Sequence, residues 1–563
     1  MLSELAYVPC ALVLTWSLFV VRGIPLTHDG LGVVWLEWYR RAYLAGDWFP
    51  TWTPFASNGH GSPAPIAYHR LHPQIFGALA IVTGPVLALK ISVPLLLVVG
   101  AAGLRRLCRM LGARPAIAWI AGVLLMSANY TVVDWFVRGA IAEFTAFMLV
   151  PWCIRYALLL FSDARGPWRL AAASELLFFA HMMTFYYIIL VAMVLCLGDL
   201  IALRRFGGGR VRQAVARGAT FAALMTCAIG PYVAALQYAV AFTPIATFKM
   251  RWDDEAYRSW SSCLLDPSFS FWRANLEGAM SAEVGRWMLL ALATVLAISA
   301  AARRVVFGPL RTLVVLAIVF FVLQPHPMAF VFDLVPGASK IQLPSRLLVF
   351  IVPITCLALA VGTERAVRSF APCVRAIAWA TLFVATAGQV HLAIDTQRSI
   401  WGSTHDSGRL AGRVERSTLD RAFADPDDST GHGLAQWETW DLFLPTGLSP
   451  LPRTPFLQTE GACTISSSSK RLMLGSDASA AQAPLQCNRV SFTVHGGNCE
   501  VGLSQYRSPL LRVRLSGPGA VRTSHDGTTV IRVENDGTTV QIDERSILDL
   551  ARLWLVEKLS RQT

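Results

Sequence analysis

Charged residues are scarce in this sequence. Asp, Glu, Lys and Arg make up 15% of the 563 residues, whereas 54% are apolar. The uncharged runs of Leu, Val, Ala, Ile and Phe are longer than the core of a soluble protein requires. A removable signal peptide is also absent from the first 21 residues, which have neither a basic start nor a small-residue cleavage site. We therefore expect a polytopic α-helical membrane protein whose first apolar segment is a retained span.

Several nucleotide- and metal-binding signatures are missing as well. The absence of an internal repeat, a GxGxxG loop and a Walker loop argues against an ATP-driven transporter. A transporter of another kind would need ionisable residues near the bilayer midplane, but most polar residues here lie at expected helix ends. Neither a CxxC motif nor a His/Cys pairing indicates zinc. A disulfide is permitted among four cysteines expected outside the membrane, whose pairing stays open: Cys263, Cys463, Cys487 and Cys499.

Apolar stretches of membrane-spanning length predict about eleven spans. Nine of them are expected at about 6–22, 86–104, 116–131, 142–161, 216–240, 287–302, 309–324, 346–362 and 375–391. A split region at about 170–202 would supply two short helices that meet at a break from His181 to Thr184. Residues 74–83 are too short to span and are expected to form a helix on the membrane surface.

Basic residues orient these spans. The loops assigned to one side carry seventeen arginines against two acids, Asp163 and Glu364. This is the positive-inside pattern, which places those loops and the amino terminus in the cytoplasm and the carboxyl-terminal part outside. The formal charge of +13 therefore reflects membrane orientation, and a nucleic-acid partner is not expected.

The carboxyl-terminal part has a different composition. We expect a membrane domain over residues 1–391, with its first outer loop at 23–85, and a soluble extracytoplasmic domain over 392–563. Within the latter, residues 490–494, 510–515, 528–533 and 538–542 alternate in β fashion between turn signals, which predicts a small β-sandwich. Residues 546–559 are expected to form a closing amphipathic helix.

Ionisable side chains gather at the expected outer ends of the spans. The first span is followed by His28 and Asp29, and the loop that they open also carries His60 and Tyr68. Asp134 and Arg138 lie between the third and fourth spans, and Glu143 lies just inside the fourth. Each of these charges is costly there unless it is solvated, paired or used. Further candidates at other span ends are Lys90, His181 and Arg346. Cations that face the same side as Asp29 and Glu143 would suit a ligand with a phosphate head and a lipid tail.

Simpler explanations exist for these residues. Asp134 and Arg138 have the i,i+4 spacing of an ordinary ion pair. Lys90 and Arg346 have the positions of interfacial anchors that reach toward water. Asp29 could be a solvated loop residue or the cap of a helix over 31–44.

The quoted segments also resemble a known family. The first outer loop is similar to that of the GT-C glycosyltransferase superfamily, with the closest likeness to bacterial 6-pyruvoyl-tetrahydropterin-synthase-related and YfhO-like membrane proteins, over Asp29–Arg41, Gly46–Pro50, Asn58–Pro63 and Tyr68–Pro73. Val137–Glu143 followed by Leu149–Trp152 is similar to that group's most specific motif. Weaker matches are found at His181–Thr184, Gln342–Arg346 and, for a terminal β-domain, Gln505–Val540.

The resemblance implies a reaction. GT-C enzymes transfer a sugar from a polyprenyl-phosphate or polyprenyl-diphosphate donor to a glycan, lipid or protein acceptor at the outer face of the membrane, here the bacterial inner membrane. By that likeness Asp29 and Glu143 are catalytic: Asp29 would deprotonate the acceptor hydroxyl or bind a divalent ion. The remaining candidates would bind substrate, with the cations at the leaving phosphate: His28, His60, Tyr68, Lys90, Asp134, Arg138, His181 and Arg346.

Two questions stay open at this level. Asp29 has no second acid beside it, so a cofactor such as Mg²⁺ or Mn²⁺ is neither required nor excluded, and no histidine triad supports pterin-synthase chemistry. The alternative to an enzyme is a GT-C-like scaffold that binds or presents a lipid-linked glycan in envelope polysaccharide assembly. A scaffold would tolerate changes at Asp29 and Glu143, whereas an enzyme would not.

Overall fold

The computed structural model describes residues 2–25, 32–53, 62–203, 208–241, 284–301, 309–338, 344–369, 371–402, 413–414, 457–460, 464–466, 489–506, 508–525 and 528–560. Three predicted site residues, His28, Asp29 and His60, lie outside these ranges. The chain forms two compact units. The first comprises Met1–Gly30, Lys90–Met225 and Lys249–Arg413, and the second comprises Leu31–Leu89, Thr226–Phe248 and Val414–Thr563.

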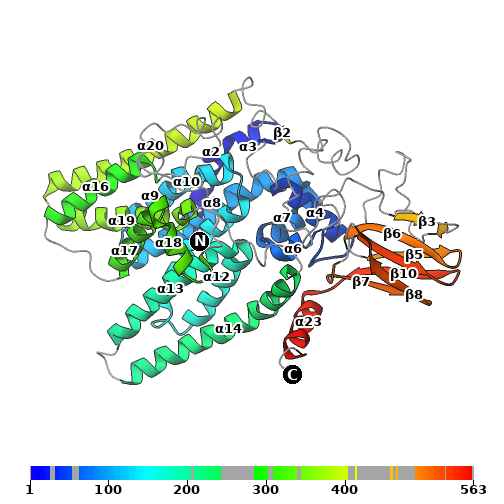
Figure 1. Cartoon of the computed structure of the whole chain (residues 1–563). Coiled ribbons are helices and arrows are strands. Elements are labelled where there is room, and N and C mark those ends of the chain that lie inside the picture. The colour runs from blue at the N-terminus through cyan, green and yellow to red at the C-terminus, as the bar shows by residue number, and fades with distance from the viewer. Residues whose placement is uncertain are drawn as a thin grey trace. The chain divides into compact units, whose positions relative to one another are not determined.

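Helices build the first unit (Figure 1). In chain order they are α1 Leu2–Leu5, α2 Tyr7–Leu14, α3 Trp16–Val20, α8 Pro85–Met110, α9 Pro115–Ser127, α10 Asn129–Val132, the π-helix η1 Val133–Val137, α11 Ile141–Leu159, α12 Gly166–Ala180, α13 Met182–Leu203, α14 Gly208–Val240, α16 Arg286–Ala301, α17 Pro309–Val322, the short turns η6 His326–Met328, α18 Ala329–Leu334 and η8 Pro344–Leu347, α19 Leu348–Ser369 and α20 Pro372–Gly402. Two-residue strands lie at β1 Ile24–Pro25 and β2 Arg413–Val414. The first residues of α8 and the second half of α14 belong to the second unit.

Six of the described helices are long and apolar enough to cross a membrane. They begin at Pro85, Ile141, Met182, Gly209, Pro344 and Pro372, and a seventh candidate is α9 with its continuation to Val137, bent by 46°. The chain is therefore a multi-pass membrane protein, while about eleven spans stays a prediction. The first expected span is interrupted at Thr15, whose φ of −121° leaves the helical region between α2 and α3.

Burial separates central helices from peripheral ones in the first unit. The span that contains α19 is 94% buried and that of α11 is 78% buried, whereas the span in α14 is 17% buried. A helix that is apolar all round fits a position inside the bundle or against lipid, so periodicity alone does not distinguish the two. The predicted break in the split region is confirmed, because His181 is extended (φ −162°) between α12 and α13.

The helices of the second unit come mainly from the first outer loop: α4 Gly32–Leu44, α6 Ala64–Ala67 and α7 Leu71–Thr83. A glycine lets α4 and α7 approach closely, because a Cβ at Gly77 would lie 2.7 Å from the Cβ of Tyr39. The helices expected over 31–44 and 74–83 are present as α4 and α7. Whether α7 lies on a membrane surface stays a prediction.

The carboxyl-terminal part of the second unit contains a β-sandwich (Figure 1). One sheet has the order β4-β5-β10-β7 and the other β3-β6-β9-β8, from strands Leu457–Glu460, Thr464–Ser466, Arg489–His495, Cys499–Tyr506, Leu511–Leu515, Gly519–Thr523, Thr528–Val533 and Thr538–Glu544. Both sheets contribute to one apolar core, which includes Phe492, Val501, Ile531 and Val540. The four predicted strands and the closing helix, α23 Ile547–Ser560, are confirmed.

Two expectations about the carboxyl-terminal part differ from the structure. The boundary predicted at 391/392 falls inside α20, which continues to Gly402. The first outer loop groups with the carboxyl-terminal part because of long-range contacts, such as the hydrogen bond from Thr51 Oγ1 to the Arg545 carbonyl (2.9 Å). Cys499 is disulfide-bonded.

Candidate functional site

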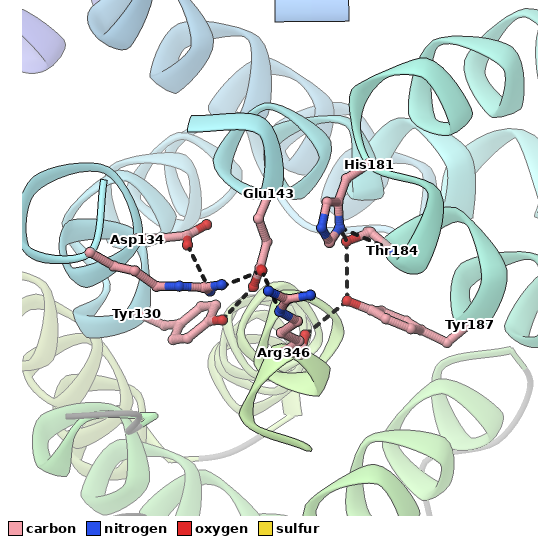
Figure 2. Close-up of polar contacts among 8 residues, drawn as sticks. Tyr130, Asp134, Glu143, His181, Thr184, Tyr187 and Arg346 are labelled. Atoms are coloured by element: carbon pink, nitrogen blue, oxygen red, sulfur yellow. Dashed lines mark hydrogen bonds and ion pairs between the residues drawn. The ribbon is translucent and has the colours of Figure 1, made fainter. Parts of the chain in front are cut away.

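Polar side chains from four separate segments meet inside the first unit. We define the Glu143 cluster as eight residues, shown in Figure 2: Tyr130, Asp134, Arg138, Glu143, His181, Thr184, Tyr187 and Arg346. All eight side chains are buried. A group of ionisable side chains inside a membrane protein is expensive to bury, which makes it a candidate functional site.

Irregular backbone places the first half of the cluster. Tyr130 is on α10 and Asp134 is on the π-helix η1, in which the Arg138 amide bonds the Val133 carbonyl at 2.7 Å. Gly139 then takes a φ of +72°, which only glycine adopts easily, and ends this helix. Glu143 consequently falls in the first turn of α11, where the helix dipole favours a negative charge.

The Glu143 carboxylate is the centre of the cluster (Figure 2). Its Oε1 accepts a hydrogen bond of 2.6 Å from the Tyr130 hydroxyl. Its Oε2 lies 2.9 Å from Arg138 Nη1 and 3.1 Å from Arg346 Nε. Arg138 Nη1 also lies 3.5 Å from Asp134 Oδ1, so the ordinary i,i+4 pair exists but is longer than the contact to Glu143. Glu143 therefore holds two guanidinium groups on one oxygen atom.

Charge is balanced within this group. The two carboxylates of Asp134 and Glu143 face the two guanidinium groups of Arg138 and Arg346, and the side chains are at most 8% exposed. Removing one member of such a set leaves an uncompensated buried charge, which is more costly than the set itself. The arrangement fits one of two uses: a rigid structural link, or a preorganised pair of cations for an anionic ligand.

A chain of hydrogen bonds joins His181 to the same place. His181 Nδ1 lies 2.8 Å from Thr184 Oγ1, which lies 3.1 Å from the Tyr187 hydroxyl. That hydroxyl donates to the backbone carbonyl of Arg346 at 2.9 Å. The chain ties the start of α13 to η8, the turn that carries Arg346 (Figure 2).

The structure brings five of the predicted site residues together: Asp134, Arg138, Glu143, His181 and Arg346. Sequence reasoning did not select Tyr130, Thr184 or Tyr187. The last two follow His181 at intervals of three, the spacing that puts residues on one face of a helix, and this signal could have identified them.

Two other predicted site residues have different surroundings. The Lys90 ammonium donates to the Val21 carbonyl at 2.8 Å, so it closes the end of the first apolar segment. Tyr68 is in the second unit, where its ring stacks on Trp35 at 6.0 Å between centroids. In the described part of the chain no group of three His, Cys, Asp or Glu residues could hold a metal ion, and Asp29 lies outside that part.

One acidic residue of the first outer loop, Glu37, is paired within the second unit. Glu37 is buried and pairs with Arg40 (2.7 Å) and Arg41 (2.6 Å). Burial opposes its ionisation, but these two arginines outweigh burial and lower the pKa of Glu37. The Trp38 and Trp52 side chains of this loop are also buried.

Comparison with known proteins gives a limited likeness. No family model matches the chain, and no curated protein matches it in sequence. Among solved structures, arabinofuranosyltransferase AftD from mycobacteria is similar at 20% identity over 75% of this chain and 28% of AftD, with a TM-score of 0.46. An oligosaccharyltransferase of Archaeoglobus fulgidus is similar at 12% identity over 80% of this chain and 60% of that protein, with a TM-score of 0.46.

A third similar structure is AglB of Archaeoglobus fulgidus with an inhibitory peptide and a dolichol-phosphate, at 11% identity over 80% of this chain and 61% of AglB, with a TM-score of 0.45. These neighbours are GT-C glycosyltransferases. The chain spans less than two thirds of each of them. Because all three TM-scores are below 0.5, the likeness by itself does not establish a shared fold.

Proposed function

We propose that this protein is a GT-C-type membrane glycosyltransferase that moves a sugar from a polyprenyl-phosphate donor to an acceptor at the outer face of the membrane. The observation that carries the proposal is the Glu143 cluster. Two segments that resemble GT-C motifs, Val137–Glu143 and Gln342–Arg346, lie about two hundred residues apart and meet through a contact of 3.1 Å between Glu143 and Arg346.

The proposed reaction is a displacement at the anomeric carbon of the donor sugar. Asp29 takes the proton from an acceptor hydroxyl, whose oxygen forms the new bond to that carbon. The bond between the carbon and the phosphate oxygen breaks, and polyprenyl phosphate leaves with the electron pair. Arg138 and Arg346 stabilise the charge that develops on the phosphate, and Glu143 keeps their guanidinium groups together.

Substitution of Asp29 tests this proposal. In cells from which the gene has been deleted, the full-length wild-type chain should restore the native envelope glycan, read by mass spectrometry of released sugars. Asp29→Asn should reduce transfer by at least about a hundredfold, because it removes the general base. Asp163→Asn is the matched control: Asp163 pairs with Arg169 and its side chain is 30% exposed, so product should be unchanged.

A normal glycan in cells that carry Asp29→Asn, at equal protein level in the membrane, would refute the enzyme and favour the scaffold. Glu143→Gln provides a second arm. An enzyme loses activity with Glu143→Gln even where the protein still inserts, whereas a scaffold loses function only with its fold.

A further inference from the structure

The closing helix α23 has two faces that differ in burial. One face carries Leu550, which is fully buried, together with the partly buried side chains of Leu553, Trp554 and Glu557. These residues follow one another at intervals of three or one, then three, which places them on a single side of a helix. This side of α23 is therefore the one that is turned toward the rest of the protein.

The opposite face of α23 is apolar and exposed. Leu548 is 71% exposed, Leu555 is 52% exposed and Leu559 is 56% exposed. Their spacing of seven and then four residues puts them on one line along the helix, which we call the leucine line. Val556 lies beside this line and is 56% exposed. A continuous apolar strip of this kind, unlike scattered exposed leucines, marks a surface that contacts an apolar partner.

The charged residues of α23 are sorted in the same way. Arg552 and Lys558 are exposed and lie on either side of the leucine line. Glu557 is on the opposite, partly buried face, and Asp549 is held at the start of the helix, where its Oδ2 accepts the Ser546 hydroxyl at 2.9 Å. Basic residues beside an apolar strip, with the acids away from it, are typical of a helix that lies in the surface of a membrane with anionic lipids.

A membrane-spanning helix ends close to α23. The candidate span in α14 continues to Val240, and its second half, from Thr226, belongs to the same unit as α23. Tyr238, two residues before the end of that span, is near enough to Arg545 and Glu557 for their charges to act on its hydroxyl group. Figure 1 shows the start of α23 beside this end of α14.

Printed contacts through the first outer loop join the same two elements. The Arg70 guanidinium lies 5.7 Å from the ring centre of Tyr232 in α14 and 5.9 Å from that of Phe49. Two residues after Phe49, the Thr51 hydroxyl donates to the carbonyl of Arg545 at 2.9 Å, just before α23 begins. All of these residues belong to the second unit. The start of α23 is therefore connected to a helix that is itself inserted in the membrane.

We propose that α23 is an interfacial helix: its leucine line is buried in the bilayer that α14 crosses, and Arg552 and Lys558 contact anionic lipid headgroups. The 14 residues of α23 extend over about 21 Å, which is too short for a hydrocarbon core of about 30 Å, so the helix lies along the membrane surface. Because β10 leads directly into α23, the helix attaches the β-sandwich to the membrane at a second place besides α14. This inference does not depend on the proposed function.

Photolabelling of the full-length protein in nanodiscs tests the proposal. The nanodiscs contain phosphatidylcholine, phosphatidylglycerol and a lipid with a diazirine in its acyl chain, and mass spectrometry of peptides locates the adducts. We expect adducts in α23 along the leucine line, with labelling of α14 as the internal standard. Leu555→Ser combined with Leu559→Ser should reduce labelling of α23 by at least about tenfold, because two apolar side chains leave the bilayer.

The matched control removes an exposed leucine from the first unit. Leu334 is 73% exposed, so Leu334→Ser makes the same chemical change and should leave the labelling of α23 as in the wild type. Amide exchange of β9 and β10 shows whether the sandwich of each variant is folded.

A second pair of substitutions tests the charges without touching the leucine line. Arg552→Gln combined with Lys558→Gln should reduce labelling of α23 by up to about fivefold for each basic residue in nanodiscs that contain phosphatidylglycerol. In nanodiscs of phosphatidylcholine alone the same pair should have no effect, because no anionic headgroup is present. This variant keeps the apolar face, so it decides the question if the double serine variant unfolds the sandwich.

Three results would overturn the interfacial helix. One is an absence of adducts in α23 when α14 is labelled in the same sample. Another is labelling that persists in the double serine variant or that does not depend on anionic lipid in the wild type. The third is a chemical crosslink between the α23 helices of two copies, because the leucine line would then be covered by a second copy of the chain rather than by lipid.

Discussion

Substitution of Glu143 by Gln should destabilise the first unit because of charge rather than shape. An amide can direct its oxygen toward Arg138 and Arg346 and its nitrogen toward the Tyr130 hydroxyl, so the contacts at 2.6–3.1 Å can be kept. The negative charge that both buried guanidinium groups contact is lost. Breaking a buried ion pair on one side costs about 3–5 kcal/mol, which we expect for Glu143→Gln.

A second substitution separates charge from packing. Glu143→Gln combined with Arg346→Gln leaves Asp134 opposite Arg138, so the formal charge balances again. We expect the double variant to be more stable than the sum of the two single changes, with a coupling energy of about 0.5–3 kcal/mol. The assay is unfolding of the purified protein in detergent micelles, followed by helical circular dichroism.

The control removes the same charge near the surface. Glu4 pairs with Arg106 at 2.6 Å, but the two side chains are 20% and 41% exposed, so Glu4→Gln should cost less than about 1 kcal/mol. The charge argument fails if Glu143→Gln costs no more than Glu4→Gln. It fails equally if the double variant shows no coupling, because the cost would then come from packing.

Two further predictions concern packing and the hydrogen-bond chain. Gly122→Ala should destabilise the bundle by about 1–3 kcal/mol, because the new Cβ would lie 2.3 Å from the Tyr7 hydroxyl. Gly198→Ala is the matched control: a Cβ at that position has no atom within 4 Å, so the change should stabilise the bundle by about 0.5–1 kcal/mol. Equal unfolding midpoints for the two variants would contradict this prediction. Tyr187→Phe removes the donor to the Arg346 carbonyl and should cost about 1–3 kcal/mol, and an unchanged midpoint would show that this hydroxyl contributes nothing.

Local features of the fold were predictable because they depend on short stretches of sequence. Apolar runs and arginine-rich connections located the helices, and alternation located β5, β7, β9 and β10. The strand β8 was not predicted because its residues are mostly exposed and show no apolar alternation. The division into units was also not predictable, since it depends on contacts such as Thr51 to Glu544 between residues far apart in the chain.

Five of the eight members of the Glu143 cluster were predictable from the sequence, but their arrangement was not. Asp134, Arg138, Glu143, His181 and Arg346 stood out in the sequence because charged or polar residues at membrane edges need a reason. That Glu143 takes both arginines on one oxygen, and that Tyr187 holds the Arg346 backbone, appear only in three dimensions.

The sequence by itself determined that this is a multi-pass helical protein with a carboxyl-terminal β-domain and a set of ionisable residues at its helix ends. The tertiary structure decided which of those residues meet. Hydrophobic periodicity is a local property, so it can be read from neighbouring residues. A contact such as Glu143 with Arg346, or Glu544 with the Thr51 amide, has no local signature. In the sequence Glu544 does not differ from Glu500, whose partner is a surface arginine, and only the folded chain separates the two.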